Sequence, residues 1–231
     1  MTSPGTDAAA LGAIIARTRY LLLDFDGPIC SIFAGLPAPT VAEKLRKLLP
    51  GELPEEIANS PDPIEVFKYS ATVSDEMAAR VEAEMADLEV AAVPTADPTP
   101  YTHQVIASAL ESGRVVGVVS NNSPRAVNAY LDRHGLSDGI ALIVARTGHD
   151  PALLKPNPHL INEAIRGLDA APAESALVGD SLTDIEAAHS AGVASIGYAN
   201  KLGKRERMKQ LQAGAVITSM ADLALFLRAY R

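Results

Sequence analysis

The stretch LLLDFDG at residues 21–27 joins a continuous apolar run to two acidic side chains. The leucines at residues 21–23 have the character of a strand that is covered on both faces of a parallel sheet. Asp24 and Asp26 follow at once, and side chains two residues apart on an extended chain point to the same side. Carboxylates at the end of a buried strand are costly unless a cation binds them. The stretch therefore predicts a central strand with a cation site at its carboxyl end.

Five further short apolar runs predict the other strands of the same sheet. They alternate with amphipathic helical segments through residues 102–231, which indicates an α/β fold with a doubly wound parallel sheet. Boundary signals accompany the helices, such as Ser123-Pro124 before AVNAYLDRH and Asp184 at the head of IEAAHSA. The five runs are VVGVV (115–119), ALIVA (141–145), SALVG (175–179), ASIG (194–197) and AVIT (215–218).

Residues 32–97 depart from this alternation, because they contain amphipathic helical patterns with no strand between them. We therefore predict an α/β core from residues 1–31 and 98–231 with an inserted α-helical cap at residues 32–97. Motion about the two junctions is expected to close the cap. The charges of DEMAARVEAEMADLE in the insert, and those of KLGKRERMKQ near the end of the chain, are expected to lie on solvated helix faces.

Composition limits the classes of function. The 231 residues are 48% hydrophobic and 21% charged, which is ordinary for a globular domain, and the formal charge of −8 argues against general binding to nucleic acid or to an anionic membrane. No apolar run approaches the length of a membrane span, and the N-terminus lacks a secretory pattern. The single cysteine, Cys30, excludes an intrachain disulfide and favours a reducing compartment. A cytoplasmic protein that acts on or binds a small molecule is expected.

Polar side chains follow the predicted strands at the positions where parallel sheets bind ligands. Carboxylates, a hydroxyl and a lysine at one edge of a sheet suit a magnesium ion bound together with a phosphate, since Mg²⁺ takes oxygen ligands and shares them with phosphate. A lysine adds positive charge for the phosphate and for neighbouring carboxylates. The predicted site residues are Asp24, Asp26, Ser120, Asn121, Lys155, Asp180 and Asp184.

Four motifs in this order carry a resemblance to a known family. They are DFDG (24–27), VVSN (118–121), LLKP (153–156) and GDSLTD (179–184). Together they resemble the haloacid dehalogenase superfamily of phosphohydrolases, and the insert resembles the α-helical C1-type cap of its phosphoglycolate-phosphatase-like branch. The resemblance spans residues 20 to about 200. It implies a Rossmann-like core and a Mg²⁺-dependent phosphatase that acts on a small phosphorylated metabolite.

The resemblance also implies a role for each residue of the site. Asp24 is expected to be the nucleophile that forms an aspartyl-phosphate, and Asp26 the general acid and base. Magnesium is expected on the Asp24 carboxylate, the Asp26 backbone carbonyl and Asp180, with Asp184 acting through water or by fixing Lys155.

The transferring phosphoryl group is expected to contact Ser120, Asn121 and Lys155, also by resemblance. The Asp-Ser pair of phosphoglycolate-type phosphatases is absent around residues 30–32, which weighs against phosphoglycolate as the substrate. Leu36 stands where sugar-phosphate mutases with this cap carry a histidine. A mutase of the same superfamily stays an alternative, and a receiver-like phosphoacceptor signalling domain is the alternative from another class.

Overall fold

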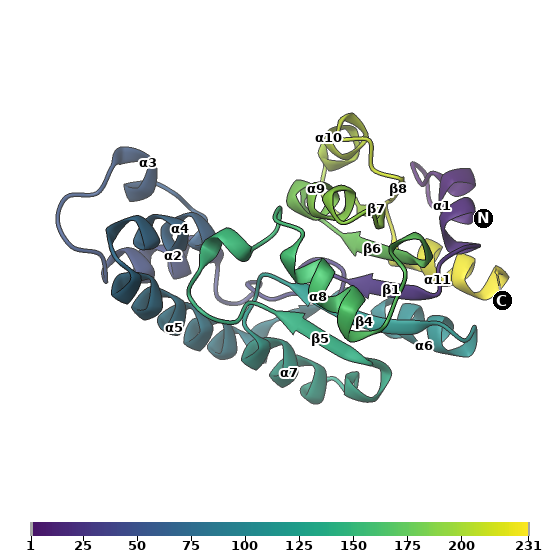
Figure 1. Cartoon of the computed structure of the whole chain (residues 1–231), viewed down its shortest axis with the longest axis horizontal. Helices are drawn as coiled ribbons and strands as arrows, with labels where there is room; N and C mark the ends of the chain where they lie inside the picture. Colours follow the sequence, from purple (N-terminus) through teal and green to yellow (C-terminus); the bar gives the residue numbers. More distant parts are fainter. Residues whose placement is uncertain (1, 231) are drawn as a thin grey trace.

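The apolar run that precedes Asp24 forms β1 (Tyr20–Leu23), a central strand of a six-stranded parallel sheet in the computed structural model, which describes residues 2–230 (Figure 1). The strand order is β5-β4-β1-β6-β7-β8. Leu23 lies opposite Val118 of β4 on one side and Val178 of β6 on the other. The other strands of this sheet are β4 (Val115–Ser120), β5 (Leu142–Ala145), β6 (Ser175–Gly179), β7 (Ala194–Tyr198) and β8 (Ala215–Ile217). The predicted doubly wound parallel sheet is confirmed.

Helices cover both faces of the sheet, because successive side chains of each strand point to opposite faces. Leu21 and Leu23 are fully buried in an apolar cluster with α1, α6, α7 and α11, whereas Leu22 packs on the other face with α8 and α9. These helices are α1 (Ala8–Ile15), α6 (Thr102–Glu111), α7 (Pro124–Arg133), α8 (His159–Gly167), α9 (Leu182–Ser190) and α11 (Met220–Ala229), with α10 (Lys204–Gln210) beside α9. Single 3₁₀ turns lie at η1 (Val93–Thr95), η2 (Ser137–Gly139), η3 (Pro151–Leu153) and η4 (Pro172–Glu174).

The inserted segment forms a helical cap beside the core (Figure 1). It has its own apolar cluster, in which Val66, Phe67 and Val81 are fully buried, and each such side chain stabilises the cap by roughly 1.5–3 kcal/mol. The cap helices are α2 (Ala38–Arg46), α3 (Glu55–Ala58), α4 (Pro63–Val73) and α5 (Asp75–Ala92). The chain enters and leaves the cap through the paired strands β2 (Cys30–Ser31) and β3 (Asp97–Pro98), which join the two junctions in one antiparallel ribbon.

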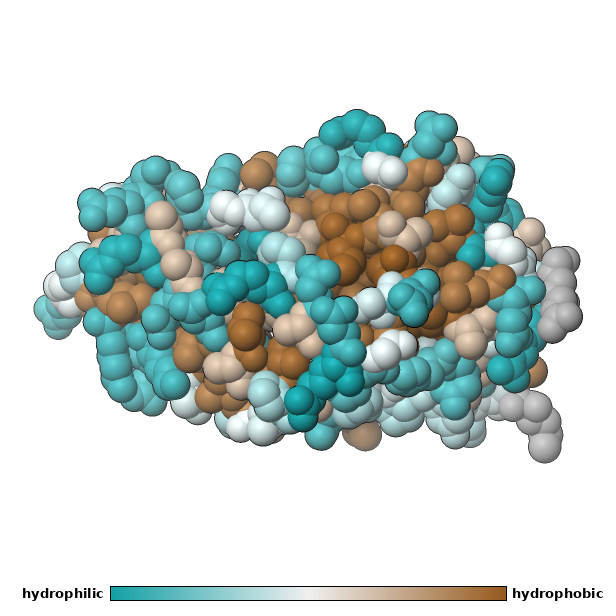
Figure 2. All heavy atoms as spheres, turned by 90° about the horizontal axis from the view of Figure 1, so that it is seen from below, coloured by the Kyte–Doolittle hydropathy of each residue, from teal (hydrophilic) through white to brown (hydrophobic). Residues whose placement is uncertain are grey.

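The surface differs between the two parts of the molecule. Figure 2 shows hydrophobic residues gathered on the core, while hydrophilic residues dominate the cap on this face. In Figure 1 the lowest strand is β5, the edge of the sheet, where residues 142–144 are only partly buried.

No helix among residues 2–230 combines the length and the apolar character that crossing a membrane requires.

Candidate active site

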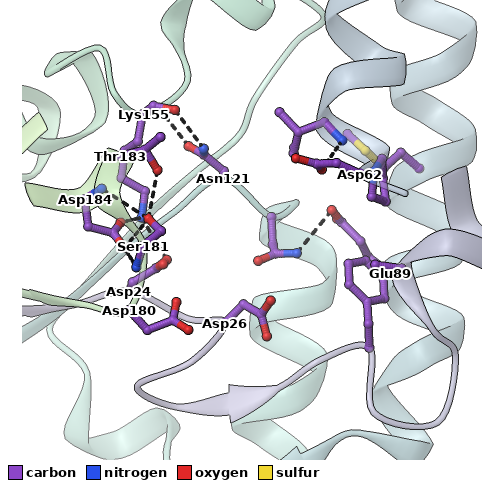
Figure 3. Close-up of a pocket in the computed structure, with 16 residues that line it drawn as sticks. Asp24, Asp26, Asp62, Glu89, Asn121, Lys155, Asp180, Ser181, Thr183 and Asp184 are labelled. Atoms are coloured by element: carbon purple, nitrogen blue, oxygen red, sulfur yellow. Dashed lines mark hydrogen bonds and ion pairs between the residues drawn. The ribbon is translucent and has the colours of Figure 1, made fainter. Parts of the chain in front are cut away.

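The carboxyl ends of β1 and β6 and the loop after β4 face the cap across a cavity of about 270 Å³ (Figure 3). Its walls come from both parts of the chain, so a ligand in it contacts core and cap together. From the core, it is lined by Asp24, Asp26, Asn121, Asn122, Lys155, Asp180, Ser181, Thr183 and Asp184. Six of the seven predicted site residues therefore meet at this cavity.

Lys155 lies among the carboxylates of the core side. Its Nζ is 2.8 Å from Asp24 Oδ1 and 2.6 Å from Asp184 Oδ1, and it donates a hydrogen bond to the Val119 carbonyl at 3.1 Å. The Lys155 ammonium group is thus the cation of both carboxylates, and the ion pair with it accounts for the buried Asp184 Oδ1. Burial alone would lower the pKa of Lys155, but Asp184 and Asp24 outweigh it and raise that pKa. The ammonium group therefore stays charged.

Asp24 is held rigidly at the end of β1. Its backbone N–H donates to the Val178 carbonyl at 2.9 Å, and its Oδ1 accepts from the N–H of Phe25 at 2.7 Å. Burial raises the pKa of Asp24 well above its usual range, Asp184 adds to the rise, and Lys155 opposes it only in part. A further cation beside Asp24 would favour its ionised form.

Asp26 occupies the middle of the cavity, between the core carboxylates and the cap (Figure 3). Its Oδ1 accepts from the N–H of Ile32 at 3.0 Å, and burial raises its pKa to about 6. A carboxyl group with a pKa near neutrality suits the transfer of a proton in both directions. Gly27 follows with φ 102°, and a Cβ there would lie 2.3 Å from Asp180 Cγ. Only glycine permits this approach of the two loops.

Asp180 and Asp184 flank the start of α9. The helix begins at Leu182 with Ser181 as N-cap, so the expectation that Asp184 heads the helix was wrong. Asp184 is the third helical residue, and its Oδ2 accepts from the N–H and the hydroxyl of Ser181 at 3.0 and 2.6 Å in a capping box. The other carboxylate oxygen, Asp184 Oδ1, pairs with Lys155 at the lining of the cavity.

A basic residue far along the chain also reaches the site. Asp180 Oδ2 accepts from Asn200 Nδ2 at 2.9 Å and pairs with Lys204 Nζ. The expectation that the charges of KLGKRERMKQ lie on a solvated face was therefore wrong for Lys204, whose side chain is 18% exposed.

The loop after β4 is tied to the loop that carries Lys155. Asn121 Nδ2 donates to the Lys155 carbonyl at 3.2 Å, and Asn121 Oδ1 accepts from the Lys155 N–H at 2.9 Å. Ser120 is fully buried and does not line the cavity; its hydroxyl donates to Asn122 Oδ1 at 3.1 Å. Ser120 thus shapes the loop from within.

A buried ion pair joins the cap to this loop. Glu89 of α5 and Arg146, just after β5, form a two-pronged contact at 2.9 and 3.1 Å, with side chains 2% and 1% exposed. Glu89 also accepts from the Ser123 N–H at 2.7 Å, and Arg146 donates to the Asn121 carbonyl at 2.6 Å. The expectation of a wholly solvated charged face on DEMAARVEAEMADLE was therefore wrong for Glu89, because Arg146 satisfies its charge.

The residues present fit a divalent cation. Asp24, Asp180 and Asp184 each offer a carboxylate oxygen, and these oxygens lie within 4.8 Å of one another. Oxygen donors of this kind are what Mg²⁺ prefers. Asp24 and Asp184 share a single buried ammonium group, that of Lys155, so a further cation would offset the repulsion between these carboxylates.

Residues 40–198 match the family described as haloacid dehalogenase-like hydrolase. The match covers more than half of the chain and contains the predicted site residues from Ser120 to Asp184. The chain is a haloacid dehalogenase-like hydrolase.

Two curated relatives and one solved structure illustrate what this hydrolase is similar to. A phosphoglycolate phosphatase of Vibrio vulnificus (strain YJ016) is 28% identical over 124 residues, 54% of each chain. Pyrophosphatase PpaX of Bacillus anthracis (strain A0248) is 26% identical over 125 residues, 54% of this chain and 57% of that protein. The chain thus spans about half the length of the curated relatives it matches. A predicted phosphatase from Clostridium acetobutylicum has a TM-score of 0.72 at 17% identity, covering 90% of this chain and 97% of its own, which shows the fold alone.

Sequence reasoning on this hydrolase missed Glu89, Arg146, Asn122 and Lys204. Asn122 directly follows the predicted Asn121 and bonds to Ser120, so extending the motif by one residue would have found it. The other three become part of the site only through contacts between distant segments, so their immediate neighbours in the sequence carry no signal. Glu89 lies near the C-terminal end of a long cap helix, and its sequence neighbours alone predict a solvated charge there. A rule that pairs charges at strand ends with those on cap helices is what could have found Glu89 and Arg146.

Proposed function

We propose that this hydrolase removes phosphate from a small phosphorylated metabolite with Mg²⁺, through an aspartyl-phosphate on Asp24. The observation that carries the proposal is the placement of Asp24, 12% exposed, between Lys155 at 2.8 Å and a cavity that Asp26 also lines. A carboxylate held in this way is a fixed nucleophile beside a positive charge.

Two steps account for the reaction. Asp24 attacks phosphorus while the bond from phosphorus to the ester oxygen breaks, and Asp26 donates a proton to the departing alcohol. Asp26 then accepts a proton from water as that water attacks the aspartyl-phosphate, which releases inorganic phosphate and restores both carboxyl groups. Lys155 and the N–H group of Asn121 orient the phosphoryl oxygens. Magnesium, held by Asp24, Asp180 and the Asp26 carbonyl with Asp184 adjoining, would supply neutralising charge.

The test is the hydrolysis of p-nitrophenyl phosphate by the full chain with and without Mg²⁺. We expect activity only with the metal, and a loss of roughly 10³-fold or more in Asp24→Asn, which keeps shape but removes the nucleophile. Acid quenching in the steady state followed by peptide mass analysis should find a phosphoryl group on the Asp24 peptide. Turnover after chelation, or full activity of Asp24→Asn, would refute the proposal.

The same measurements separate the two alternatives. A receiver-like domain keeps its aspartyl-phosphate for minutes, so phosphorylated protein would accumulate without release of phosphate. A mutase would move phosphate between two hydroxyls of a sugar phosphate and would release little of it to water.

A further inference from the structure

The wall of the cavity that belongs to the cap differs in chemistry from the core wall. Five of its side chains are apolar, and together they face the place where the leaving group of a phosphate ester would lie. They are Phe33, Ala38, Pro63, Ile64 and Met85. An apolar wall of this kind favours contact with the hydrocarbon part of a ligand.

Positive charge is confined to the core side. Among residues 2–230, Lys155 is the only lysine, arginine or histidine that lines the cavity, and it already lies against Asp24 and Asp184. Arg146 reaches this region only behind Glu89. Its side chain is 1% exposed, and its guanidinium is bound to Glu89, to Glu82 at 3.2 Å and to the Asn121 carbonyl. A negatively charged leaving group would find no free counterion at the cap.

Negative charge, in contrast, is present on the cap wall. Asp62 Oδ1 accepts from the N–H of Ile64 at 2.9 Å and caps α4, which fixes the carboxylate at the cavity across from Asp24 and Lys155 (Figure 3). The single basic residue of α4, Lys68, pairs with Glu65 at 2.9 Å instead. Glu89, the other acidic residue of this wall, is neutralised by Arg146, so Asp62, at an exposed position, is the acidic side chain of the cap wall that forms no ion pair among residues 2–230.

We propose that this hydrolase selects phosphate monoesters whose leaving group carries no negative charge, and that Asp62 is the residue that discriminates. The proposal rests on the phosphatase function proposed above. An ammonium group on the leaving group is attracted to Asp62, whereas a carboxylate or a second phosphate is repelled by it and lacks a partner. Phosphoglycolate and pyrophosphate, from which the two relatives take their names, both belong to the disfavoured class.

Three small phosphate esters that differ in the charge of the leaving group test the proposal: 2-aminoethyl phosphate, ethyl phosphate and phosphoglycolate, each with Mg²⁺ present. We expect kcat/KM to fall in that order, with about tenfold between the first and the last, the ratio for a contact worth about 1.4 kcal/mol. Binding of the same esters to the Asp24→Asn variant, measured by calorimetry, should give the same order without turnover.

Substitution of Asp62 links the preference to one side chain. Asp62→Asn keeps an N-cap of similar strength, so the fold of α4 is retained while the charge is lost. We expect the ratio between 2-aminoethyl phosphate and phosphoglycolate to shrink at least about threefold in this variant. Glu56→Gln, at an exposed position on α3 outside the cavity lining, removes the same charge from the cap and should leave the ratio as it is.

The outcomes are distinguishable. Hydrolysis of all three esters with phosphoglycolate equal or preferred, or a ratio unchanged by Asp62→Asn, overturns the leaving-group proposal and leaves the phosphatase function intact. No hydrolysis of any ester, p-nitrophenyl phosphate included, overturns the phosphatase function itself.

Discussion

Replacing Arg146 by methionine should destabilise the protein far more than removing an exposed ion pair between the same two parts of the chain. In Arg146→Met, the side-chain volume is roughly kept, but Glu89 loses both of its contacts with the guanidinium, at 2.9 and 3.1 Å. The Glu89 carboxylate, 2% exposed, then remains buried without a cation. A charge left in this state strongly favours unfolding, because the unfolded chain hydrates it.

The size of the destabilisation depends on the hydrogen bonds that Glu89 retains in the variant. Removing one partner of a buried ion pair costs about 3–5 kcal/mol. Glu89 still accepts from the Ser123 N–H at 2.7 Å and from Asn122 Nδ2 at 3.2 Å, so the lower end of that range applies, about 3 kcal/mol. For a domain of this size, the melting temperature should fall by roughly 6–12 °C.

Urea and thermal denaturation of three variants measure the effect. Arg125→Met is the matched control, because Arg125 pairs with Asp87 of the same cap helix at 2.6 Å but the two side chains are 62% and 63% exposed. It should cost no more than about 1 kcal/mol. The double variant Glu89→Gln, Arg146→Met removes both charges and should recover about 1–2 kcal/mol relative to Arg146→Met alone.

Two results would contradict the reasoning. Equal losses in Arg146→Met and Arg125→Met would mean that burial does not set the strength of the pair. A double variant less stable than Arg146→Met would mean that the unpaired carboxylate is not the source of the loss.

Two further predictions concern the acidic loops. Gly27→Ala places a Cβ 2.3 Å from Asp180 Cγ at φ 102°, so we expect a loss of about 1–3 kcal/mol in denaturation and weaker Mg²⁺ binding by calorimetry; unchanged binding would argue against a close packing of these loops. Asp26→Asn should raise the melting temperature of the metal-free protein, and more so as the pH rises. The folded-state pKa of Asp26, about 6, lies above its unfolded value, so native stability is lost as the pH rises through about 4–6, and the variant escapes that loss. A gain that does not depend on pH would refute this account.

The fold was largely predictable because its signals are local. Each strand of the parallel sheet is a short apolar run bounded by turn residues, and the helix at Pro124 begins where Ser123 caps it, as the dipeptide predicts. The positions of Asp24 and Asp180 at the cavity were predictable for the same reason, since each directly follows the end of a buried strand. The wrong start of α9 also has a local cause, because Ser181 and Asp184 are both residue types that favour the first positions of a helix. In the structure Ser181 is the N-cap and Asp184 completes the capping box.

The parts that were missed depend on contacts between distant segments. Glu89 and Arg146 are 57 positions apart, and their pairing exists only once α5 has packed against the loop after β4. Lys204 reaches Asp180 across 24 positions in the same way. Charge at these positions has no local signature that distinguishes a solvated face from a buried partner. Only the tertiary structure decides which of the two applies.

The buried pair also bears on how the cap can move. Two sets of contacts restrain hinge motion at the junctions. The first is the β2–β3 ribbon, and the second is the set of bonds from Glu89 to Arg146 and to the Ser123 N–H. Arg146 donates to the Asn121 carbonyl, and Asn121 in turn forms two hydrogen bonds with the backbone of Lys155. A wide opening of α5 that breaks the Glu89–Arg146 pair would therefore also disturb the position of Lys155. The C-terminal end of α5 is therefore expected to move together with the core residues that contact the phosphoryl group. The apolar wall is divided between these elements, because Ala38, Pro63 and Ile64 lie on α2 and α4 while Met85 lies on α5. We therefore expect the motion that admits a substrate to occur at α2 and α4, beside Asp62, with α5 held in place by the buried pair.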